Sequence, residues 1–209
     1  MFTFEKYQEA ALRSIKPHDS KELATADWAL GIGGEAAEVT ELYLNAVNNK
    51  MTKAKEIGDV IWYATALAKE LELEIKGFSE GEEREEPPAI LSVMLLVTAG
   101  RIQEAVKHFM FHKEKTSKEH IQAELDVLLL QVANLCASEY MSINDCAELN
   151  AGKLAHRFNL KNGGQYNKTA SENRHSRETE FSETATYKRL VGRITGIEIA
   201  IDPEDTEVL

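Results

Sequence analysis

The sequence predicts an all-α fold, and three observations support this prediction. Apolar residues recur at spacings of three and four along most of the chain, as they do on the buried face of a helix. The 209 residues include only 4 Pro and 12 Gly, and they are rich in Ala, Leu, Glu and Lys, which favour helices. Two segments in the first half of the chain are similar to two in the second half, which predicts a duplicated helix pair.

The first half of the chain, residues 1–78, is expected to hold three helices. A short helix should end near Pro17, because proline cannot continue a helix. Longer helices are expected over residues 21–49 and 52–73. An Asp-Ser pair precedes the second helix and a Thr begins the third, and these residue types are common N-terminal caps.

The second half begins after an acidic, proline-containing segment, residues 79–88, which is typical of a solvated linker. The helical pattern then resumes over residues 89–113 and 117–137. A shorter helix over residues 143–158 closes this half, which we place at residues 89–165.

The two halves align with each other in two places. Residues 34–39 are similar to residues 100–105, and residues 55–61 are similar to residues 122–128, at nearly the same separation in the chain. A helix pair duplicated in one chain should pack as a four-helix core with approximate two-fold symmetry. The duplication could take the place of a dimer, or two chains could still pair as a homodimer or a higher oligomer.

The last part of the chain, residues 166–209, is a polar tail. It is charged and has few apolar residues until about residue 189. We therefore expect a flexible arm that ends in a short strand or hairpin. The apolar residues behind the strand prediction are Leu190, Val191, Ile194, Ile197, Ile199 and Ile201.

Composition and charge exclude several classes of protein. The formal net charge of -11 and the pI of about 5.1 disfavour binding to a nucleic-acid polymer, because such proteins need a basic surface. Only two cysteines are present, Cys136 and Cys146, so a disulfide scaffold is not expected. We see no signal-like segment and no apolar stretch of about 18 residues. We expect a cytoplasmic protein without a membrane partner.

Acidic residues recur every three positions on two of the predicted helices. Glu35 and Glu38 lie on the first, and Glu56 and Asp59 repeat this spacing on the next. Residues three apart share one helix face, so like charges are held together and repel. A hard divalent cation such as Mg²⁺ or Mn²⁺ would compensate four such carboxylates. The alternative is an ordinary solvated acidic face, to which we assign the neighbouring Glu41.

These residues resemble the motifs of a known family. The segments Gly34–Glu38 and Glu56–Tyr63 resemble the E-x-x-E and E-x-x-D motifs of the MazG-like nucleoside triphosphate pyrophosphohydrolases. The helix near the N-terminus is similar to the opening helix of that family, and residues 150–158 are similar to its closing N-x-x-K-L-x-x-R-[FY] helix. With the duplication allowed, the resemblance covers roughly residues 2–160.

The resemblance implies an all-α, MazG-like enzyme that cleaves a nucleoside or deoxynucleoside triphosphate into the monophosphate and pyrophosphate. It implies that Mg²⁺ is held by Glu35, Glu38, Glu56 and Asp59. The ion would lower the pKa of a water molecule that attacks phosphorus. We expect Glu38 also to act as the catalytic residue that orients or deprotonates this water.

Four further residues are expected to bind the substrate. Lys153 and Arg157, four positions apart on one helix, would neutralise phosphate charge, and Asn150 would add a polar contact. Their alternative role is an ordinary basic helix end. Trp62 could stack on the base, and core packing is its alternative role.

The second half departs from the family motif, which leaves the substrate open. Arg101 and Ala123 stand where Glu35 and Glu56 stand in the first half, so a second metal site is not expected. The arrangement also resembles the dimeric dUTPases of the same all-α superfamily, which makes a dUTP-selective enzyme the first alternative. The second is a nucleotide sensor or interaction module without catalysis.

Overall fold

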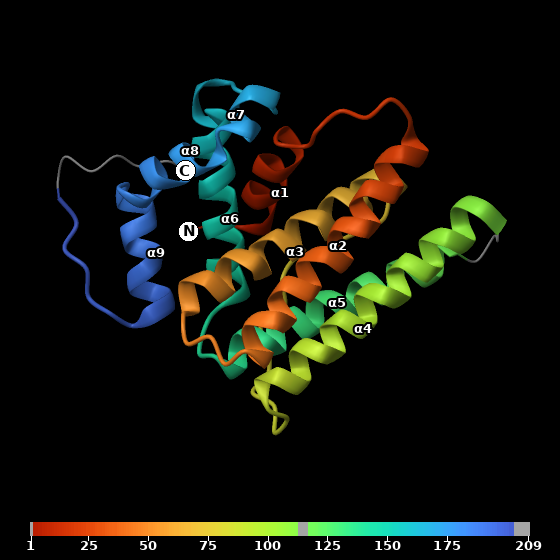
Figure 1. The fold of residues 1–209 in the computed structure, drawn as a ribbon, viewed down its shortest axis with the longest axis horizontal. Helices are drawn as coiled ribbons and strands as arrows, with labels where there is room; N and C mark the ends of the chain where they lie inside the picture. The colour runs from red at the N-terminus through yellow and green to blue at the C-terminus, as the bar shows by residue number, and fades with distance from the viewer. Residues whose placement is uncertain (1, 113–116, 203–209) are drawn as a thin grey trace.

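A computed structural model describes residues 2–112 and 117–202 of the chain (Figure 1). Within these residues the structure consists of helices and connecting segments, with no strand. The prediction of an all-α fold is confirmed.

Local capping explains where the second and third helices begin. Helix α1 spans Phe4–Arg13, α2 spans Lys21–Leu44 and α3 spans Lys50–Leu71. The Ser20 side chain caps α2 by accepting a hydrogen bond from a backbone N–H of the first turn, and Asn49 caps α3 in the same way. Helix α2 ends five residues earlier than the expected residue 49, because Asn45 is its C-cap and Ala46 turns the chain with a left-handed φ of 51°.

The second helix pair follows a long irregular segment. Helix α4 spans Pro88–Lys107 and continues into a π-helical turn, His108–His112, and α5 spans Ser117–Ser138. Proline is favoured in the first turn of a helix, where its missing N–H costs nothing, so the last residue of the expected linker is the first of α4. The rest of that linker is mostly exposed to solvent, and the Glu82 N–H donates a hydrogen bond to Asn134 on α5.

The four long helices pack side by side. Helix α2 lies between α3 and α4, and α4 packs against α5 (Figure 1). Helices α2 and α4 approach closely at Gly33, where a Cβ would lie 2.1 Å from the side-chain nitrogen of Gln103 on α4. The same nitrogen donates a hydrogen bond to the Ala29 carbonyl on α2. At a second crossing point, the Thr40 hydroxyl donates to the Ser92 carbonyl.

Helix α6, Ile143–Phe158, forms the centre of a second group of helices (Figure 1). It packs against α3 and is surrounded by α1, α8 and α9, so most of its residues are buried. A short 3-10 helix, Leu160–Asn162, follows it.

The strand or hairpin expected in the tail is wrong for the described residues. The tail forms three helices, α7 (Lys168–Glu172), α8 (Arg174–Ser182) and α9 (Ala185–Thr195). Leu190 and Ile194 are four residues apart, and both are buried on one face of α9. The three later isoleucines that alternate in the sequence lie beyond α9 in a non-helical segment. Residues 203–209 lie outside the described residues.

The segment Pro88–His112 is long and apolar enough to cross a membrane, by length and composition alone. No such segment was expected from the sequence. Part of its apolar character belongs to the protein core, since Leu95 and Ile102 are fully buried against neighbouring helices.

Candidate functional site

A cleft of about 470 Å³ lies among α2, α3, α6 and the tail helices α7 and α8. Its walls carry both signs of charge. The acidic residues that line it are Asp27, Glu35, Glu38, Glu56, Asp59 and Glu178. The basic residues that line it are Lys16, Lys55, Lys153, Arg157 and Arg174.

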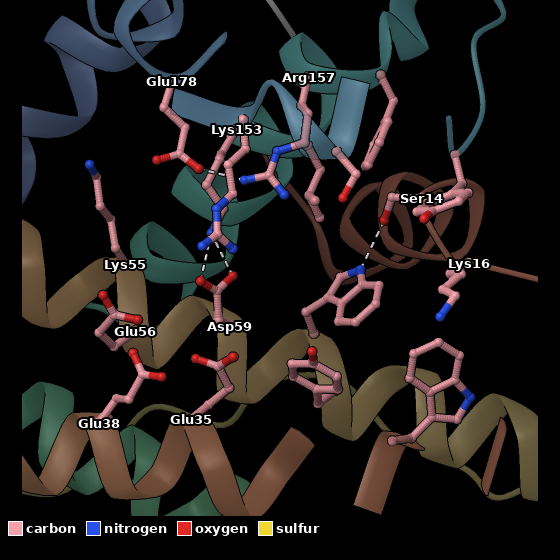
Figure 2. Close-up of a pocket in the computed structure, with 18 of the residues that line it drawn as sticks. Ser14, Lys16, Glu35, Glu38, Lys55, Glu56, Asp59, Lys153, Arg157 and Glu178 are labelled. Atoms are coloured by element: carbon pink, nitrogen blue, oxygen red, sulfur yellow. Dashed lines mark hydrogen bonds and ion pairs between the residues drawn. The ribbon is translucent and has the colours of Figure 1, made fainter. Parts of the chain in front are cut away.

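Three carboxylates meet on one wall of the cleft. Glu35 and Glu38 lie one helical turn apart on α2, and Glu56 lies on α3, which packs against it (Figure 2). One carboxylate oxygen from each residue lies within 4.8 Å of the others. Three of the four residues predicted as metal ligands therefore converge.

The carboxylates repel each other in this arrangement. Burial and the negative charges of Asp59, Glu38 and Glu56 together raise the pKa of Glu35 to about 8, while Lys153 opposes the shift. Burial and the charge of Asp59 also raise the pKa of Glu56. The positive charges of Lys153 and Lys55 thus offset the repulsion within the cluster only in part. A divalent cation with oxygen ligands suits such a donor set, because it would offset this repulsion.

Asp59 lies next to the cluster but has partners of its own. The Lys153 ammonium donates hydrogen bonds to both Asp59 oxygens at 2.5 and 2.6 Å, and the Asn150 side-chain amide donates to one of them at 2.6 Å (Figure 2). The Lys153 side chain is only 9% exposed, so this ion pair is largely shielded from water. Two of the predicted substrate-binding residues therefore contact the fourth predicted metal ligand.

A glycine allows this contact between helices. Gly58 lies on α3 beside Asp59, and a Cβ there would lie 2.8 Å from the Asn150 Cβ and 2.9 Å from the Cys146 carbonyl oxygen. Real Cβ atoms do not approach other atoms so closely, so a larger residue would push α6 away from α3. Gly58 thus lets Asn150 and Lys153 reach Asp59.

The tail contributes residues that the sequence did not reveal. Arg157 on α6 donates a hydrogen bond of 2.5 Å to Glu178 on α8 (Figure 2). Arg174 and His175, also on α8, line the same cleft. They were missed because residues 166–209 were predicted to be a flexible arm.

The other end of the cleft is aromatic. Trp62 is half-buried, lines the cleft and donates a hydrogen bond of 2.9 Å from its indole nitrogen to the Ser14 hydroxyl. Its ring makes edge-to-face contacts with Trp28 and Tyr63, at centroid distances of 5.5 and 4.8 Å. Trp62 therefore belongs both to an aromatic cluster and to the cleft wall.

The corresponding positions of the second half do not converge. Glu104 is exposed and pairs with Lys107 on α4 and with His108 in the π-helical turn that follows, and Asp126 accepts a hydrogen bond from Gln122. In the part of the chain that the structure describes, the only group of three acidic, His or Cys residues close enough to hold a metal is Glu35, Glu38 and Glu56.

Comparison with protein-family models, curated proteins and solved structures finds no match for this chain. The function is therefore argued from the geometry of the cleft.

Proposed function

We propose that the protein is a metal-dependent nucleoside triphosphate pyrophosphohydrolase. It would cleave a nucleoside or deoxynucleoside triphosphate between the α and β phosphates and release the monophosphate and pyrophosphate. The observation that carries the proposal is the meeting of Glu35, Glu38 and Glu56 on one wall of a cleft whose other walls hold lysines and arginines. A polyphosphate needs both features, a cation site and basic side chains.

We also propose that the helices α2 to α5 form the duplicated, MazG-like four-helix core. The support is that each half of the chain supplies one helix pair, α2 with α3 and α4 with α5, and that α2 and α4 join the pairs. The aligned segments of the two halves lie on these helices.

The residues of the cleft suggest a division of roles. Glu35, Glu38 and Glu56, with Asp59 beside them, would hold Mg²⁺ or Mn²⁺, which would offset substrate charge and lower the pKa of a water molecule. Glu38 is the most exposed of the three clustered carboxylates, so it is the one best placed to orient the attacking water and accept its proton.

The basic residues would bind the phosphates. Lys55, on the same helix as Glu56, lines the cleft without an ion-pair partner among the described residues. Arg157 and Arg174 reach the cleft from α6 and α8. Lys153 would act indirectly, since its two hydrogen bonds hold Asp59 in place.

Two alternative functions would use the same cleft. A dUTP-selective enzyme would use the same carboxylates and differ only in how it recognises the base. A nucleotide sensor would use the cleft without turnover. The presence of all four acidic motif residues in the first half of the sequence favours an enzyme over a sensor.

The test is pyrophosphate release from a panel of nucleoside triphosphates, dUTP included, with Mg²⁺ and with EDTA. We expect release that depends on Mg²⁺ and yields the monophosphate. The Glu38→Gln variant should lose this activity, whereas Glu41→Gln, an exposed residue one turn further along α2 and outside the cleft, should keep it. No release from any nucleotide, by a folded protein, would refute the proposed function.

A further inference from the structure

We propose that the aromatic end of the cleft selects guanine, with Asp27 and Lys16 as the residues that determine specificity. This inference rests on the proposed function, because it takes the three clustered carboxylates to mark the phosphate end of the substrate. It names the base for which the cleft is built.

The distance between the two ends suits a nucleotide. Asp27 lies eight residues before Glu35 and eleven before Glu38 on α2. With a rise of 1.5 Å per residue these separations are about 12 and 16 Å, and eleven residues make close to three full turns. Asp27 and Glu38 thus share one side of the helix and line one cleft. A nucleotide whose phosphates lie at the carboxylate cluster would extend its base toward Asp27.

The Asp27 carboxylate is held in a fixed orientation by one of its oxygens, and the other oxygen is available to a ligand. His18 and Asp27 share a hydrogen bond of 2.7 Å between His18 Nε2 and Asp27 Oδ2. The His18 side chain is 11% exposed and its ring lies edge-on to Trp28, so the imidazole is itself fixed. The Asp27 side chain is 47% exposed, and its Oδ1 has no hydrogen-bond partner among the described residues. It can therefore accept hydrogen bonds from a ligand.

A positive charge stands beside this acceptor. Lys16 lies in the segment that joins α1 to α2, and its ammonium points into the same end of the cleft (Figure 2). It forms no hydrogen bond or ion pair within the described part of the chain. The bond between His18 and Asp27 ties the Lys16 segment to α2. This end of the cleft thus offers one anionic acceptor and one cationic donor.

Guanine is the base that matches both groups. Its N1–H and its 2-amino group are neighbouring donors that suit a carboxylate, and its O6 and N7 are acceptors that suit a lysine. Adenine and cytosine place a ring acceptor next to their amino group, so they offer Asp27 one donor and one repulsive lone pair. Uracil and thymine flank their single N–H with two carbonyl oxygens, which the carboxylate would repel.

The aromatic residues give the base a surface for stacking. Trp62 and Tyr63 are half-buried and line the cleft together with Trp28. A purine has a larger ring face than a pyrimidine and gains more from such contact. Stacking therefore favours a purine, and the Asp27 and Lys16 pair selects guanine among the purines.

The experiment measures kcat/KM for dGTP, dITP, dATP, dCTP and dUTP with Mg²⁺. The decisive pair is dGTP and dITP, because inosine differs from guanosine only by lacking the 2-amino group. We expect dGTP to exceed dITP and dATP by at least about tenfold, the discrimination that a paired donor and acceptor provides. Values for dGTP and dITP within about threefold, or a preference for dUTP, would overturn the inference.

Variants separate recognition of the base from general damage. Asp27→Asn should lower kcat/KM for dGTP by about tenfold, because the amide is uncharged and keeps only one acceptor oxygen, and it should change dATP by less than about threefold. The matched control Glu22→Gln lies on the exposed first turn of α2 and should change neither value. An equal loss for all nucleotides in Asp27→Asn would also overturn the inference.

A binding measurement tests the base site if the protein does not hydrolyse nucleotides. If no nucleotide is hydrolysed, the proposed function fails, and calorimetric titration with dGMP and dIMP then tests the base site by itself. Tighter binding of dGMP, lost in Asp27→Asn, would support a guanine site in a protein that is not a hydrolase. Equal or absent binding of the two would overturn it.

Discussion

Replacing Glu35 with Gln should stabilise the protein at alkaline pH when divalent cations are absent. In the folded protein, burial and the charges of Asp59, Glu38 and Glu56 raise the Glu35 pKa from its ordinary value of 4.5 to about 8, against the opposing charge of Lys153. A carboxyl group with a raised pKa contributes stability that is fully present below about pH 4.5 and is lost as the pH rises to about 8. Gln stays neutral, so the variant escapes this loss.

The size of the effect follows from the shift and the exposure of the site. The full change in pKa would correspond to roughly 5 kcal/mol between pH 4.5 and pH 8. Glu35 is only half-buried and faces an open cleft, where water screens the repulsion, so we expect about 2 kcal/mol. For a chain of this length that is a change in Tm of about 4–8 °C.

The assay is thermal unfolding of wild type and Glu35→Gln in EDTA, at pH 5 and at pH 8.5. The two Tm values should be similar at pH 5, and the variant should exceed wild type at pH 8.5. Added Mg²⁺ should then raise the wild-type Tm more than that of the variant, because only the wild type keeps the full set of carboxylates. The control Glu41→Gln should show no such pH dependence. An equal Tm difference at both pH values would refute the reasoning.

The remaining predictions concern the cleft and the glycines near it. Glu38→Gln should lower kcat at least about 100-fold in the pyrophosphate assay while circular dichroism is unchanged, because the proton acceptor is lost. Asp59→Asn should also abolish turnover, and urea unfolding should show a loss of about 3 kcal/mol, because the buried Lys153 ammonium loses its charged partner. Gly58→Ala should cost about 1–3 kcal/mol by pushing α3 away from α6, whereas Gly34→Ala, with no atom within 4 Å of its added Cβ, should gain about 1 kcal/mol.

The long helices were predictable because their apolar spacing is strong and their caps are local. The ends of the helices were less predictable. The Asn at position 49 could end one helix or begin the next, and only the turn at residues 45–49 decides between the two. The prediction of a strand in the tail was wrong for a related reason. Its alternating isoleucines suggested a strand, but a strand needs a partner for its backbone groups, and the described residues offer none.

The acidic cluster was predictable only in part. Helical spacing alone brings Glu35 and Glu38 to one face, and the packing of α2 on α3 then adds Glu56. The hydrogen bonds of Lys153 to Asp59 depend on how closely α6 approaches α3, which no local pattern encodes. The Glu178 contact depends on the folding of the tail over α6, so no feature of the polar segment indicated it.

The acidic wall of the cleft is formed by α2 and α3 of the first half, and the aligned positions of the second half differ in sequence. The position that corresponds to Gly58 is Leu125, which is fully buried in the core. Helix α6 packs against α3, where Gly58 leaves room for it, and much less against α5. The second half also has Arg101 and Ala123 in place of Glu35 and Glu56. The positions without carboxylates and the position without the glycine thus lie on α4 and α5, as expected if this helix pair stabilises the core.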